Sequence, residues 1–128
     1  MKKVITPREP MVQKILKWCE KNGCGDISTY GTDGSRHEID YRTNKLVSFE
    51  DQPFHLRIDG GKELLDYIIA SLGAVASKVV GISAEGALNH ALHYGTDYRL
   101  TDRFTKFLAK YGYQWKCISN CYYLVYTV

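Results

Sequence analysis

The first hydrophobic pattern lies near the start of the chain, over residues 11–22. Four apolar side chains recur there at the spacing of one helix face: Val12, Ile15, Leu16 and Cys19. Three lysines, Lys14, Lys17 and Lys21, fall together on another face. Glycines at positions 23 and 25 end the pattern, because glycine is favoured just beyond the last turn of a helix. The pattern predicts a helix with one apolar and one basic side.

The period then changes from that of a helix to that of a strand. Four segments between residues 26 and 58 read as strands: "DISTY", "RHEIDYR", "KLVSFE" and "FHLRI". In the last segment Phe54, Leu56 and Ile58 alternate with polar residues, as in a half-buried strand. Turn-forming residues at 32–35 and 43–44 separate the segments. These features favour an antiparallel meander.

Three more helices are predicted after the meander. Residues 62–80 carry a broad apolar face and should be mostly buried, with Gly73 marking either a close helix contact or a break. Residues 83–95 form the second, with Ser83 as its N-cap. Residues 99–111 form the third, capped by Thr101 or Asp97.

Two strands are predicted at the end of the chain, "YQWKCI" and "CYYLVYTV", joined by Ser119 and Asn120. The second strand is apolar at nearly every position, which is typical of a strand inside a sheet. The sequence therefore predicts a single α+β domain over residues 1–128. It has an antiparallel sheet of five to six strands, an N-terminal helix, a three-helix cluster and a C-terminal β-hairpin.

Charge is distributed unevenly along the 128 residues, although the net charge is only +3. Residues 1–25 carry six basic and two acidic side chains, residues 26–98 six and eleven, and residues 99–128 five and one. If the two basic ends meet in space, they form a positive face. If they lie apart, the charges only solvate the surface. Sequence alone leaves both arrangements open.

No apolar stretch reaches the roughly 20 residues that a membrane-spanning helix needs. The start, "MKKVITPREP", has lysines but no apolar segment like that of a secretory signal. We therefore expect a cytoplasmic protein with no membrane partner.

A basic stripe lies along the last predicted helix, because its basic residues are spaced by four, three and four: Arg99, Arg103, Lys106 and Lys110. Three helices followed by a hairpin is the order of a winged helix, whose third helix enters the major groove. Residues 75–95 also resemble a helix-turn-helix in part. Arginine can hold a guanine edge and lysine can neutralise phosphates. The stripe, with Lys116 of the hairpin, favours a non-enzymatic nucleic-acid-binding protein. The alternative is that these residues have no binding role and only form the solvated face of a helix.

Tyrosines support a second hypothesis, because the chain has ten of them and most lie in its last third. Tyrosine and tryptophan are enriched at protein interfaces and stack on bases. The alternative function is a small inhibitor or adaptor that docks on a protein partner, or captures a nucleotide-like ligand. Its candidate contacts are Tyr94, Tyr98, Tyr113, Trp115 and Arg57. Homo-oligomer formation is compatible with this hypothesis, and packing of these rings in the core would explain them without it.

Side chains that could carry chemistry form no complete motif. Four cysteines come in two pairs: Cys19, Cys24, Cys117 and Cys121. They could bind zinc together, or they could be free thiols. His90 and His93, three residues apart, could be ligands or a base, but no third ligand follows at a recognisable spacing. Glu38 and Asp40 share a strand face without the lysine that a metal-dependent nuclease would add. We therefore assign no catalytic residue, no metal and no cofactor.

Overall fold

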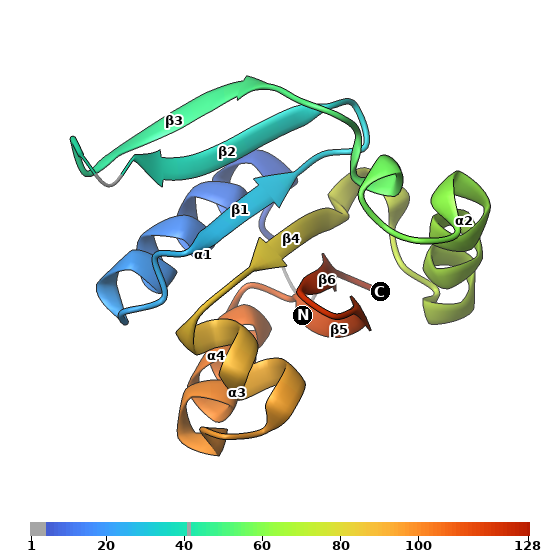
Figure 1. Cartoon of the computed structure of the whole chain (residues 1–128). Helices are drawn as coiled ribbons and strands as arrows, with labels where there is room; N and C mark the ends of the chain where they lie inside the picture. Colours follow the sequence, from blue (N-terminus) through green and yellow to red (C-terminus); the bar gives the residue numbers. More distant parts are fainter. Residues whose placement is uncertain (1–4, 41) are drawn as a thin grey trace.

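The computed structural model describes residues 5–40 and 42–128. In this part of the chain, four α-helices, six strands and two short 3-10 helices follow one another (Figure 1). In chain order they are α1 (Arg8–Lys21), β1 (Ile27–Tyr30), β2 (Ser35–Asp40), β3 (Lys45–Glu50), η1 (Phe54–Leu56), α2 (Gly61–Leu72), η2 (Ala76–Lys78), β4 (Val80–Ala84), α3 (Ala87–Tyr94), α4 (Tyr98–Lys110), β5 (Gln114–Ser119) and β6 (Tyr122–Tyr126). None of the described helices is both long and apolar enough to cross a membrane.

The strands form one sheet in the order β3-β2-β1-β4-β6-β5, and each neighbouring pair is antiparallel. The α+β class, the antiparallel sheet, the N-terminal helix and the C-terminal strands are therefore confirmed. As expected from its apolar sequence, β6 lies inside the sheet, between β4 and β5.

Helices cover both faces of the sheet. The larger core joins α1, α3 and α4 to one face, through residues such as Leu16, Leu88 and Phe104. The smaller core joins η1 and α2 to the other face, through Phe54 and Leu65. The predicted three-helix cluster is wrong in this respect, since α2 lies on the opposite face from α3 and α4.

Residues 54–58 do not form the predicted strand. Phe54 is buried and begins η1, whereas Leu56 is 58% exposed, so the two side chains do not share one face. Pro53 precedes this turn, and the Phe54 amide donates to the Gly31 carbonyl (3.2 Å), which pins the segment beside β1. Alternation of apolar residues was misleading here because only Phe54 and Ile58, four residues apart as on a helix, are buried.

The helix predicted over residues 62–80 ends at Leu72. Gly73 adopts a left-handed conformation (φ 66°), which ends a helix at low cost only for glycine. Residues 80–84 instead form β4 between β1 and β6, where the β-branched Val80 and Ile82 are buried in the larger core. Ser83 consequently lies in a strand and is not a helix cap, and α3 begins after Gly86. The helix-turn-helix interpretation of residues 75–95 is wrong, since residues 80–84 form a strand. The three helices also do not pack together as in a winged helix, because α2 lies on the opposite face of the sheet from α3 and α4.

The apolar helix α2 is much less buried than its sequence predicts. Leu65 is its one fully buried residue. Tyr67 is 69% exposed, and Leu64 is exposed as well. Val75 and Val128, outside the helix, are also exposed apolar residues. The prediction of a mostly buried helix is therefore wrong.

Candidate functional site

The basic stripe lies on the outer side of α4. The Asp97 carboxylate caps the helix by accepting a hydrogen bond from the Leu100 amide (3.1 Å), so Arg99 lies inside the helix. Leu100, Phe104 and Leu108 are buried in the larger core. All four basic residues of the stripe are exposed on the side away from this core.

Helix α1 packs beside α4 through aromatic rings. The Trp18 ring stacks on Phe107 with centroids 5.2 Å apart, and lies 5.4 Å from Phe104. Near the end of α4, the Lys14 and Lys110 ammonium groups lie 4.9 and 5.6 Å from the centre of the Tyr111 ring. The two helices therefore run antiparallel, because early α1 residues meet the late end of α4 and later ones meet its middle.

This packing brings the two basic ends of the chain together. Lys17 and Lys21 are exposed, and Lys14 is half-buried over Tyr111. Successive helix residues turn by about 100°, which places these lysines on the outer side of α1. We call the combined surface the basic face: Lys14, Lys17, Lys21, Arg99, Arg103, Lys106 and Lys110. Asp102 lies at its margin and pairs with Lys106 at 2.9 Å.

The other flank of α4 is occupied by α3 and β5. The Thr101 hydroxyl donates to the Ala91 carbonyl of α3 (3.0 Å), and the Trp115 indole of β5 donates to the Thr105 hydroxyl (2.9 Å). The rotation of about 100° per helix residue also places three cations of α4 closer to its α1 flank than to the flank that contacts α3 and β5: Arg99, Arg103 and Lys110. The two rows of cations therefore converge on the α1–α4 seam.

Lys116 does not belong to this surface. Its neighbours in β5, Trp115 and Cys117, pack against the core on the α4 side of the sheet. Side chains alternate along a strand, so Lys116 points to the opposite face. Of the five residues predicted to contact nucleic acid, the structure gathers four and separates Lys116.

The residues of the tyrosine hypothesis do not share one surface. Tyr98 and Tyr94 are exposed, at 74% and 58%. Tyr113 is buried, and its hydroxyl donates to the Thr6 carbonyl (2.7 Å). Trp115 is held by Thr105, and Arg57 lies beside Asp51 on the face of the sheet that carries α2.

The four cysteines remain in two separate pairs. Burial raises the pKa of Cys19 and of Cys24, so both thiols stay protonated at neutral pH. Cys117 lies 3.5 Å from Nδ1 of His93, but burial raises the pKa of this thiol too. Among residues 5–40 and 42–128, no three His, Cys, Asp or Glu side chains are grouped so as to hold a metal ion. The structure therefore gives no support to the zinc hypothesis within these residues.

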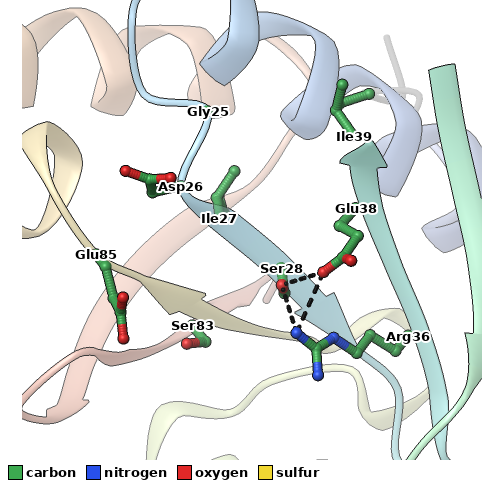
Figure 2. A pocket seen from close by; sticks show the side chains of 9 residues that line it. All are labelled: Gly25, Asp26, Ile27, Ser28, Arg36, Glu38, Ile39, Ser83 and Glu85. Carbon is green, nitrogen blue, oxygen red and sulfur yellow. Dashed lines mark hydrogen bonds and ion pairs between the residues drawn. The ribbon is translucent and has the colours of Figure 1, made fainter. Parts of the chain in front are cut away.

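A pocket of about 290 Å³ opens on the uncovered part of the sheet face that carries α2 (Figure 2). The Ser28 hydroxyl donates to Oε2 of Glu38 (2.9 Å), and Nη2 of Arg36 donates to both groups at 3.2 Å. Asp26 and Glu85 carry the other charges of its lining. With three carboxylates and one guanidinium, the lining is acidic.

The arginine of the pocket is engaged by the protein itself. Nη1 of Arg36 donates to Asp51 (2.7 Å), and Asp51 also pairs with Arg57 at 2.7 Å. The guanidinium groups of Arg36 and Arg57 lie 5.1 and 4.3 Å from the centre of the Tyr30 ring. Hydrogen bonds from Arg36 and from the Gln52 amide lower the pKa of Asp51 to about 2. Sequence reasoning missed this network, because it depends on strand register that places Glu38 opposite Ser28.

No family model matches the chain, and neither does any curated protein or solved structure that was compared with it.

Proposed function

We propose that the protein binds nucleic acid without catalysing a reaction, through the basic face of α1 and α4. The proposal rests on the packing of aromatic rings between α1 and α4, which we call the aromatic seam: Trp18, Phe104, Phe107 and Tyr111. This packing brings seven basic side chains from the two ends of the chain onto one surface. Phosphate contacts by lysine and arginine release counterions and supply most sequence-independent affinity. The acidic pocket on the opposite side of the sheet orients the molecule toward a polyanion by repulsion.

The proposed binding mode differs from the one that the sequence predicts. A winged helix contacts DNA with a hairpin beside its recognition helix, but here β6 is an interior strand and Lys116 points away. Helix α1 takes the place of the hairpin as the second contact element.

The test is fluorescence anisotropy of labelled DNA at low salt, with a double charge reversal. We expect Arg103→Glu with Lys106→Glu to weaken binding at least about tenfold, since each lost phosphate contact removes favourable counterion release. Lys45→Glu with Lys116→Glu changes the net charge equally at exposed positions outside the basic face, and should weaken binding less than about threefold. Absence of binding by the unmodified protein, or equal losses in the two variants, would overturn the proposal.

The exposed apolar side of α2 favours a second candidate function, docking on protein, and we propose a second copy of the chain as the occupant. Leu64, Tyr67, Val75 and Val128 are exposed apolar residues of or near this helix. Lys62 is paired with Asp66 at 2.6 Å, which leaves Glu63 as the other charge of α2, so two such surfaces carry much less like charge than two basic faces. Sedimentation velocity should detect a dimer that Tyr67→Glu dissociates and that high salt leaves intact. A monomer at all concentrations would rule this candidate out.

A further inference from the structure

We infer that the basic face lies across one groove of duplex DNA and contacts the phosphates of both strands, independently of base sequence. This inference rests on the proposed function and names the class of nucleic acid that the same surface fits.

Two packed helices place their rows of cations a distance apart that is comparable to the width of a DNA groove. Packed helices have axes about 8–10 Å apart. The grooves of B-form DNA are about 6 and 12 Å wide. With a rise of about 1.5 Å per residue, Arg99 to Lys110 spans roughly 16 Å and Lys14 to Lys21 roughly 10 Å. One row can therefore follow each strand over several phosphates.

Entry of α4 into the major groove is blocked by its neighbours. Trp18 holds α1 against one flank, while Thr101 and Thr105 tie the other flank to α3 and β5. A helix with its side chains is about 10–12 Å across, so two helices side by side exceed the roughly 12 Å width of the major groove. Base edges remain out of reach, and phosphate contacts carry no sequence information.

Single-stranded nucleic acid fits this surface less well, because strong single-strand binding needs aromatic rings that stack on bases. The rings of the seam are occupied: Trp18 stacks on Phe107, and Tyr111 lies beneath Lys14 and Lys110. Tyr98 is exposed beside Arg99, at the end of the α4 row, and is the ring to test.

The experiment compares four labelled probes by anisotropy: two 20-base-pair DNA duplexes of unrelated sequence, one strand of the first duplex, and an RNA duplex of that sequence. We expect the two DNA duplexes to bind within about threefold of each other and the single strand at least about tenfold more weakly. The RNA duplex should also bind more weakly, because its grooves have different widths and depths.

Variants of each row complete the experiment. Lys17→Glu with Lys21→Glu should weaken duplex binding as much as Arg103→Glu with Lys106→Glu. In each double variant, about two fewer counterions should be released on binding, which makes the dependence of affinity on salt concentration shallower. Tyr98→Ala should leave duplex binding unchanged. The inference is overturned if the single strand or the RNA duplex binds more tightly, or if one DNA sequence is strongly preferred. It is also overturned if only the α4 variant, and not the α1 variant, loses affinity for the duplex. Failure of every probe to bind would instead overturn the proposed function.

Discussion

Asp51 shows at the scale of one residue how the chain after β3 is held. It accepts charged hydrogen bonds from Arg36 of β2 and from Arg57, which follows η1, and both guanidinium groups lie over the Tyr30 ring. Charge-assisted hydrogen bonds are stronger than neutral ones. One carboxylate therefore fixes the path from the edge of the sheet to the segment that carries Phe54 into the smaller core.

Replacement of Asp51 by Asn should destabilise the protein in a way that depends on pH. Its pKa falls from an ordinary value of 3.8 to about 2 in the folded state. Stabilisation by the carboxylate is therefore complete above about pH 4 and lost as the pH falls through about 2. Urea unfolding should show that the Asp51→Asn protein is less stable at pH 7, and that this difference shrinks at pH 2.5.

The control for this prediction is Asp66→Asn, which removes an exposed ion pair with Lys62. Exposed pairs contribute little, so its stability should change by less than about 1 kcal/mol at either pH. Equal stability of Asp51→Asn and the unmodified protein at pH 7 would contradict this account of the network.

Gly81 gives a second prediction at the same scale. A Cβ atom at this position would collide with the buried ring of Phe54, which packs on the strand there. Gly81→Ala should cost about 1–3 kcal/mol of unfolding free energy, as overpacked cores do. Gly25→Ala meets no atom within 4 Å and should change stability by roughly 0.5 kcal/mol or less. Chemical denaturation of the two variants, followed by circular dichroism, makes the comparison, and equal stabilities would contradict it.

At the scale of elements, the contact between α1 and α4 is the feature that joins folding to the proposed binding of nucleic acid. Trp18 contacts Phe104 and Phe107 of α4, so the same ring buries apolar surface and sets the distance between the two rows of cations. A change in this contact should therefore alter stability and affinity together.

Trp18→Ala should lower the unfolding free energy by roughly 2–4 kcal/mol and weaken duplex binding several-fold, because the rows lose their fixed spacing. Trp115→Ala removes a ring of similar exposure from the β5 flank of α4 and should affect stability with little effect on binding. Denaturation and anisotropy on the same samples separate the two effects. Unchanged binding by a folded Trp18→Ala protein would contradict the role of the seam.

Local pattern predicted most of these elements but failed where two periods overlap. Residues of α1 and α4 show helical spacing without interruption, and both helices form. In contrast, the apolar residues of 62–84 continue from α2 into β4, although the left-handed Gly73 and the short helix η2 divide the two elements. Residues 54–58 alternate like a strand but turn because of packing around Phe54. A short apolar run does not distinguish helix from strand without its tertiary neighbours.

At the scale of the whole molecule, the sheet separates two charged surfaces. The basic face lies with α1 and α4 on one side, and the pocket with Asp26, Glu38 and Glu85 opens on the other. The sequence revealed the basic segments but not their meeting, because the Lys14–Tyr111 contact joins residues that are 97 positions apart in the chain. It also misplaced Lys116, whose direction depends on the register of β5 with β6. Such long-range pairings are not encoded in local spacing.

The most direct test of the account is the salt dependence of duplex DNA binding for the unmodified protein and for Lys17→Glu with Arg103→Glu, one change in each row. If about five phosphates are contacted, the logarithm of the association constant should fall with the logarithm of salt concentration with a slope near −4.5. We expect the variant to bind at least about tenfold more weakly, with a slope shallower by about two. Undetectable binding at low salt, or the same slope for both proteins, would contradict the assignment of the basic face.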